Sequence, residues 1–184
     1  SMTEAEVEER KERSGKPHIR TSVAANWRQL EENTHFLHEH PNSSGSWRME
    51  EVQELAADPR VYVVKGPMCR WDMMQRDSQG NMLHVRKQTR WMTSSPVLAR
   101  ILEGQCPPYL PGSTWHRHIR LEGGHRTVRA QEYPPKLVDA ILRGFKKQLQ
   151  MDRRELNSFH AGPTADEPEL WEDAQWSEEY GWEK

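Results

Sequence analysis

The chain has little apolar sequence, few cysteines and no long hydrophobic run. Apolar residues make up 34% of its 184 residues and charged residues 29%, a balance that predicts one compact domain with polar tails. No run approaches the roughly 18 apolar residues of a bilayer-spanning helix, so we expect no membrane partner. Two cysteines do not make a disulfide framework, and the polar, acidic N-terminus is unlike a signal peptide. We therefore expect an intracellular location, nuclear or cytoplasmic.

The common motifs of nucleotide-dependent and nucleophilic enzymes are missing as well. The sequence contains no GxGxxG dinucleotide motif, no GxxxxGK phosphate-binding loop and no GxSxG nucleophile motif. These absences favour a binding protein over an enzyme.

Charge is strongly segregated along the chain. Residues 1–59 carry 7 basic and 12 acidic residues, residues 60–150 carry 16 and 6, and residues 151–184 carry 3 and 10. A basic middle between acidic ends is typical of a surface that faces DNA or RNA. The alternative, which charge alone leaves equally open, is that the basic residues only solvate a small domain.

We predict three parts. Residues 1–33 form a charged helical extension, with a capping box of Thr3 and Glu6 and an end to the first helix at residues 14–17. Residues 34–150 form the folded domain. Residues 151–184 form an acidic tail that we expect to be largely disordered.

Short β-rich segments alternate with helical patterns in residues 34–150. The expected elements are strands at 34–39, 61–64 and 89–93, helices at 47–57, from Pro96 and at 135–150, and a hairpin that turns at 77–81. This order predicts the α/β class: a small, partial Rossmann-like sheet with at least two parallel strands, flanking helices and a hairpin. The strand at 61–64 has the length of a buried strand. The last helix is expected to bury Leu137, Ile141, Phe145 and Leu149 on one face.

Three histidines and a glutamate lie together in the segment 35–41, which ends at a proline. On a strand, His38 and His40 share one face and Glu39 points to the other. Alternating histidines can ligate zinc, and Glu39 could act as an acid or base in a metal-dependent hydrolase. The alternative, which we favour here, is a set of polar residues at a strand edge.

A second set of metal-ligand residues lies in the irregular segment 105–133. Cys106, His116 and His118 have zinc-ligand chemistry, and Cys69 can complete a set of four. A metal would also tether a segment this long. The alternative is a buried free cysteine beside surface histidines.

A basic strand is expected at residues 86–91. Alternation would place Arg86 and Arg90 on one face and Lys87 and Trp91 on the other. Basic side chains beside an aromatic ring suit phosphate contact and base stacking, and Arg70 lies in a similar basic and aromatic context. The alternative is a half-exposed strand whose arginines pair with carboxylates.

Taken together, several segments resemble one known series. They are His38-Glu39-His40-Pro41, Ser46-Trp47, 66–71, 86–96, Cys106, His116-Arg117-His118, Tyr133-Pro134-Pro135 and Tyr180-Gly181-Trp182. The series resembles a domain of copia-type retrotransposon polyproteins from protists. That domain is similar to the C-terminal half of phage-type cytosine-C5 DNA methyltransferases.

The resemblance implies that Glu39 matches the glutamate that contacts the target cytosine. It also implies that the segment from Arg86 to Arg90 lies near a motif with DNA-facing arginines. The methyl-donor half, with its glycine-rich loop and Pro-Pro-Cys nucleophile, has no counterpart in residues 1–33, so no S-adenosylmethionine is expected.

Three functions are therefore predicted. The first is a non-catalytic nucleic-acid-binding domain of methyltransferase-like descent. The second is a zinc-stabilised protein-interaction module. The third is an enzyme, either a metal-dependent hydrolase or half of a split DNA methyltransferase. Unpaired strand edges left by a missing half-sheet would also favour a homodimer.

Overall fold

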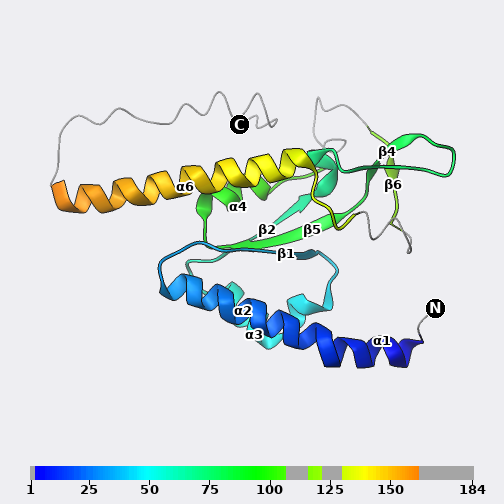
Figure 1. The fold of residues 1–184 in the computed structure, drawn as a ribbon, viewed down its shortest axis with the longest axis horizontal. Coiled ribbons are helices and arrows are strands. Elements are labelled where there is room, and N and C mark those ends of the chain that lie inside the picture. The colour runs from blue at the N-terminus through cyan, green and yellow to red at the C-terminus, as the bar shows by residue number, and fades with distance from the viewer. Residues whose placement is uncertain (1–2, 107–115, 122–129, 162–184) are drawn as a thin grey trace. The chain divides into compact units, whose positions relative to one another are not determined.

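The fold is a mixed α/β arrangement of helices and two small sheets (Figure 1). The computed structural model describes residues 3–106, 116–121 and 130–161. The predicted mixed α/β class is confirmed. A Rossmann-like sheet is not, because the larger sheet is antiparallel throughout.

One helical stretch forms the N-terminal part. It comprises α1 (Glu4–Arg10), the π-helical turn η1 (Lys11–Gly15) and α2 (Lys16–Glu31). The capping box is confirmed, since the backbone N–H of Thr3 donates to Glu6 and that of Glu6 donates to Thr3. The predicted break at residues 14–17 is wrong. Pro17 lies in the first turn of α2, where a helix does not need its missing N–H.

The larger sheet has three strands in the order β1-β5-β2. They are β1 (Leu37–Pro41), β5 (Gln88–Thr93) and β2 (Tyr62–Pro67). Both outer strands run antiparallel to β5 and therefore parallel to each other. The helical connection between them is η2 (Gly45–Arg48) and α3 (Glu50–Ala57). The predicted parallel direction is thus present, but β5 lies between the two strands.

Helices cover both faces of this sheet (Figure 1). On the face of α2 and α3, a cluster of buried side chains includes Met92 of the central strand. Its members are Ile19, Val23, Leu30, Phe36, Trp47, Val52, Leu55 and Met92. The other face carries α4 (Pro96–Leu102), whose first turn is capped by Ser95 as predicted, and the start of α6 (Pro135–Ala161). We call this unit the helix-covered sheet.

Strand β2 is less buried than its sequence predicts. Tyr62 and Val63 are each 42% exposed. The expectation of a buried strand at 61–64 is wrong because β2 is an outer strand, which pairs on one side only within the described part of the chain.

The second sheet consists of the predicted hairpin and one added strand. It contains β3 (Met74–Arg76), β4 (Met82–Val85) and β6 (His118–Ile119), in that order. Strands β3 and β4 are antiparallel, and β6 pairs parallel to β4. The short helix η3 (Met68–Trp71) connects β2 to this unit. We call it the hairpin sheet.

Helix α6 differs from its prediction in length and in its buried face. It continues through residues 151–161, which we expected in the disordered tail; residues 162–184 lie outside the described residues. It buries Leu137, Ala140, Gly144 and Gln148, whereas Leu149 is 60% exposed. Two contacts set this face. A Cβ on Gly144 would lie 2.6 Å from Leu98 Cδ2, and Gln148 accepts a hydrogen bond from Ser95 Oγ.

No helix in the described part of the chain is both long enough and apolar enough to cross a membrane.

Candidate metal centre

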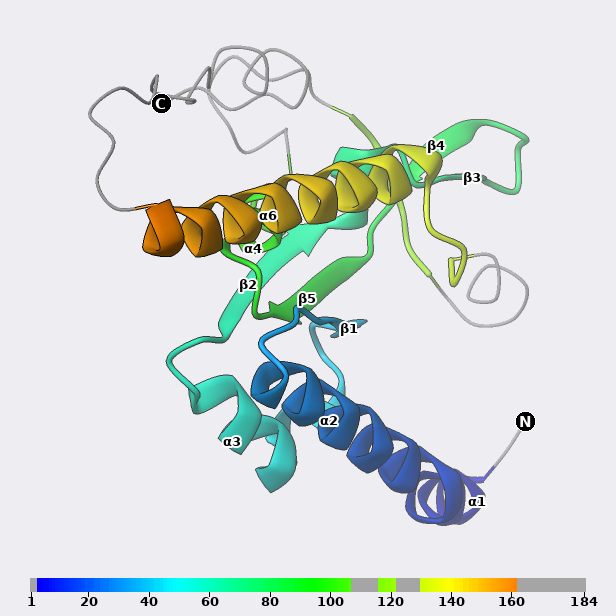
Figure 2. The same ribbon diagram turned by 60° about the vertical axis from the view of Figure 1, so that its left-hand side comes forward.

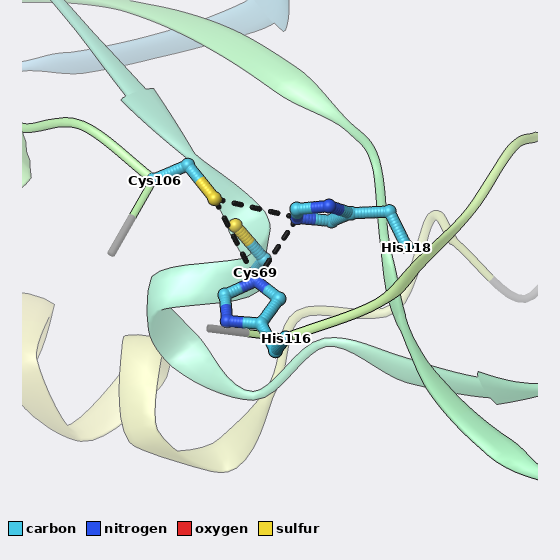
Figure 3. A group of neighbouring side chains, drawn as sticks. All are labelled: Cys69, Cys106, His116 and His118. Atoms are coloured by element: carbon cyan, nitrogen blue, oxygen red, sulfur yellow. Dashed lines mark hydrogen bonds between the residues drawn. The ribbon is translucent and has the colours of Figure 1, made fainter. Parts of the chain in front are cut away.

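Four predicted metal-ligand residues converge on one point (Figure 3). A ligand atom from each of Cys69, Cys106, His116 and His118 lies within 4.8 Å of the others. No other group of three or more such ligands was found among residues 3–106, 116–121 and 130–161.

The four residues come from three separated segments. Cys69 lies on η3, just after β2, and Cys106 follows α4. His118 begins β6, and His116 precedes it by two residues. Strand β6 is fixed against β4, because the Arg86 N–H donates to Ile119 O at 2.9 Å. The hairpin sheet therefore carries the histidines towards two buried cysteines.

The spacing of the ligand atoms of Cys106, His116 and His118 is close to that around a tetrahedral zinc ion. Zinc bonds to sulfur and nitrogen of about 2.3 and 2.0–2.1 Å place tetrahedral S and N ligands about 3.5 Å apart. Cys106 Sγ lies 3.6 Å from His116 Nε2 and 3.4 Å from His118 Nε2. The two Nε2 atoms are 2.9 Å apart, somewhat closer than in a tetrahedral site. Two thiols and two imidazoles are also the donor types that zinc prefers.

Burial sets the protonation of the metal-free side chains. Burial, followed by the hydrogen bond with Cys106, raises the pKa of the Cys69 thiol to about 12. Burial also raises the pKa of Cys106 and lowers those of His116 and His118. At neutral pH the imidazoles are therefore neutral and ready to bind a metal, while the thiols must lose protons to do so.

A second set of side chains supports His116. The His84 ring, on β4, packs against the His116 ring with 4.1 Å between their centroids. His84 Nε2 lies 3.4 Å from Asp72 Oδ1, and Lys136 Nζ of α6 lies 2.6 Å from the other Asp72 oxygen. Sequence reasoning missed this support. It depends on the pairing of β4 with β6, which places His84 beside His118 and has no signal in the sequence.

The predicted nucleic-acid residues lie in different environments. Arg86 is exposed, and its positive charge lies close enough to the metal centre to offset part of the rise that burial causes in the pKa of Cys106. The Arg90 guanidinium packs over Trp47 and donates to Asn42 Oδ1. The Arg70 guanidinium packs over Trp71 and donates to the Glu103 carbonyl.

Lys87 and Trp91 lie on the opposite face of β5, as the alternation predicts. Trp91 is fully buried, so its ring is not accessible for stacking on a base. Lys87 Nζ lies 3.5 Å from Glu39 Oε1 and donates to Ala130 O. Of the five predicted residues, only Arg86 is exposed.

Glu39 lies within an internal polar network. Besides Lys87, it is contacted by Tyr133, whose hydroxyl donates to Oε2 at 3.4 Å. Burial, followed by the charge of Glu39, raises the pKa of Tyr133. Sequence reasoning did not pair these residues, because they come from three distant segments.

The neighbouring histidines make contacts typical of a strand edge. His38 Nδ1 pairs with Asn26 at 3.3 Å, and His40 Nδ1 with Ser46 at 3.1 Å. The two rings stack with centroids 5.1 Å apart. These contacts agree with the strand-edge interpretation of residues 35–41.

Comparison with protein-family models, curated proteins and solved structures finds no match for this chain. The function is therefore argued from the geometry of the site.

Proposed function

We propose that this chain is a zinc-stabilised, non-catalytic interaction module. The observation that carries the proposal is the convergence of Cys69, Cys106, His116 and His118 within 4.8 Å. Four protein ligands complete a tetrahedral zinc site, which leaves no open position for water or substrate. This supports a structural role over a metal-dependent hydrolase.

The position of the centre supports the same role. The hairpin sheet has strands of three, four and two residues. Short strands with little apolar burial are not stable alone. A zinc ion would join β6 to η3 and to the segment after α4, and so anchor the hairpin sheet to the rest of the fold.

The test is the metal content of the full chain. One zinc per chain is expected, and substitution with Co²⁺ should give the absorption bands of a tetrahedral thiolate site. Cys106→Ser and His118→Asn should remove both signals, whereas His18→Asn, an exposed histidine on α2, should retain them. A folded wild-type chain that contains no stoichiometric metal would contradict the proposal.

A second proposal is DNA or RNA binding through the hairpin sheet. Its support is a group of exposed arginines on and beside these short strands: Arg76, Arg86, Arg117 and Arg120. Arg86 is close enough to Cys106 to offset part of the rise that burial causes in its pKa. Arg117 is close enough to the hairpin turn to add to the lowering of the Asp77 pKa by the hydrogen bond with Asn81. Phosphate contacts need this kind of accessible positive charge.

Salt dependence distinguishes this second proposal from a protein-interaction module. Affinity for a generic duplex or single strand should fall steeply with salt, and Arg86→Gln or Arg117→Gln should each lower the salt slope by about one. Arg28→Gln on α2, where Arg28 pairs with Glu32, is the matched control and should change nothing. Absence of binding at low salt would exclude DNA and RNA as partners.

Methyltransferase-like descent is also a proposal. Its support is Glu39 on β1, held by Lys87 and Tyr133. The isolated chain should transfer no methyl group to DNA; activity would contradict the inference that the methyl-donor half has no counterpart in residues 1–33.

A further inference from the structure

Strand β1 has one edge without a neighbouring strand in the described part of the chain. It is an outer strand of the helix-covered sheet, and Figure 2 shows it with α2 on one side and α6 on the other. A groove of about 540 Å³ lies along this edge. It is lined by β1 itself, by α2 and by the start of α6.

The hydrogen-bonding direction of β1 follows from its pairing with β5. The Asn42 N–H donates to Gln88 O, one step beyond the pair Pro41–Thr89. Antiparallel pairs alternate between hydrogen-bonded and non-hydrogen-bonded, so His40 and His38 also point their backbone groups to β5. Leu37 and Glu39 therefore direct their N–H and C=O groups into the groove.

On either side of Leu37 and Glu39, the outward-facing backbone groups of this edge already have hydrogen-bond partners within the chain or are absent. Gln29 Nε2 donates to His35 O at 3.1 Å. At the other end, Pro41 has no N–H, and its carbonyl accepts from Ser44 N and from Trp47 Nε1. The open edge is thus a short segment with two donors and two acceptors, which matches the backbone of a short extended peptide.

The two walls of the groove differ in polarity. The α6 wall carries Val138 and Leu142, which are 40% and 63% exposed. The α2 wall carries Ser22 and Asn26, with the His38 ring beside them. Side chains of an added strand would alternate between these walls.

The charge of the groove also limits its occupant. Glu39 is the only Asp, Glu, Lys or Arg side chain that lines it, and Glu39 is already paired with Lys87 at 3.5 Å. Burial lowers the pKa of His38 to about 4, which leaves that ring neutral at pH 7. An anionic occupant would lose hydration without finding a cationic partner in the groove, and the charge of its one carboxylate is already balanced by Lys87, so an uncharged peptide is the complementary one.

We propose that this groove binds an uncharged extended peptide segment of a partner protein, which adds a strand to β1. Apolar side chains of the peptide contact Val138 and Leu142, and hydroxyl or amide side chains at alternate positions contact the α2 wall. The proposal does not depend on zinc binding, because the groove and the metal centre share no residue.

The test uses the full chain with zinc and a blocked pentapeptide of alternating valine and threonine. Binding should shift the NMR signals of the Leu37 and Glu39 amides and slow their hydrogen exchange. Two N-methylated forms, modified at all valines or at all threonines, remove the N–H groups on one edge of the peptide at a time. One form should bind about tenfold more weakly or worse, because it loses its bonds to β1, and the other should bind unchanged. If the form methylated at the valines loses affinity, the peptide pairs with β1 in the antiparallel direction.

Leu142→Glu should weaken binding about tenfold, since it places a charge on the apolar wall. Leu149→Glu is the matched control: Leu149 is 60% exposed on the same helix but does not line the groove, so binding should be unchanged.

Three results would overturn the proposal. The first is no change at the Leu37 and Glu39 amides with millimolar peptide. The second is an equal effect of both N-methylated forms. The third is a dimer, dissociated by Leu142→Glu, in which these amides are already protected without peptide, because a second copy of the chain would then occupy the edge.

Discussion

The helix-covered sheet and the hairpin sheet are held in place by different means. The helix-covered sheet buries a cluster of eight side chains, one of which belongs to its central strand. The second has strands of three, four and two residues, with Val85 and Ile119 as the buried apolar side chains of β4 and β6. The four metal ligands lie where the hairpin sheet meets η3 and the end of α4.

This difference shows how a small unit can be ordered without a core of its own. Burial of apolar area stabilises a sheet in proportion to that area, and the hairpin sheet has little to bury. Binding of a metal to these four side chains, which come from separate segments, would supply the missing free energy at one point. The comparison leads to tests in which one sheet responds and the other does not.

Removal of zinc should give the largest effect, and it should be confined to the hairpin sheet. Structural zinc contributes about 10–16 kcal/mol of apparent binding free energy in zinc-finger peptides, so a chelator should release β6 from β4. Hydrogen exchange should accelerate at the amides of Val85 and Arg86, which bond to Met73 and Ile119, and stay slow at Met92. Equal loss of protection in both sheets would show that the metal holds the whole domain.

A cavity in the helix-covered sheet should give the next largest effect. Leu55 is fully buried, so Leu55→Ala should lower the free energy of unfolding by about 2–5 kcal/mol. Val63→Ala, at a residue 42% exposed on β2, is the control and should stay within about 0.5 kcal/mol of wild type. Denaturant titration gives both values. Zinc affinity of the folded Leu55→Ala chain should be unchanged; a loss would mean that the two sheets are not independent.

The sequence predicted the metal ligands better than the surfaces around them. Ligand chemistry is carried by residue type, so Cys106, His116 and His118 could be selected before their positions were known. Base stacking by Trp91 was predicted from its place beside basic residues on one strand, and alternation correctly puts Trp91 and Arg90 on opposite faces of that strand. Alternation does not say which face is covered, and Tyr133, just before α6, packs its ring against Trp91.

The strand order of the helix-covered sheet and the buried face of α6 depend on tertiary contacts, which local sequence patterns do not reveal. The helix between β1 and β2 predicted their common direction, but only the long-range pairing of β5 places that strand between them. Apolar spacing in α6 favoured a face with Leu149. The close approach of Gly144 to Leu98 and the hydrogen bond of Gln148 to Ser95 turn a different face inward.

Acid should destabilise the helix-covered sheet through His38. Burial, and then the nearby His40, lower the pKa of folded His38 to about 4, while the unfolded value is about 6.5. The unfolded chain therefore binds more protons between these values, and stability falls as pH decreases from about 6.5 to about 4. The loss is at most about 3 kcal/mol, and above pH 6.5 this residue contributes no pH dependence.

The measurement is the free energy of unfolding against pH in the presence of a chelator, which removes any effect of metal release. His38→Gln should flatten the curve in this window. His18→Gln, at an exposed residue that contributes less than burial and His40 to the lowered pKa of His38, should change the slope less than His38→Gln. An unchanged slope in His38→Gln would assign the acid sensitivity to other groups.

The smallest effect should come from the ion pair that joins α6 to the metal centre. Lys136 Nζ lies 2.6 Å from Asp72, and both side chains are about half exposed or more, at 66% and 47%. Exposed ion pairs contribute about 0.2–1 kcal/mol and weaken with salt. Lys136→Gln should therefore cost less than about 1 kcal/mol at low salt and almost nothing at high salt.

A double-mutant cycle with Asp72→Asn isolates the coupling of this pair, and the remaining effect of Asp72→Asn alone reports its contact with His84. Because His84 packs on His116, that remaining effect should weaken zinc binding while Lys136→Gln leaves it unchanged. A coupling energy that persists at high salt would mean that α6 and the hairpin sheet are joined by more than charge.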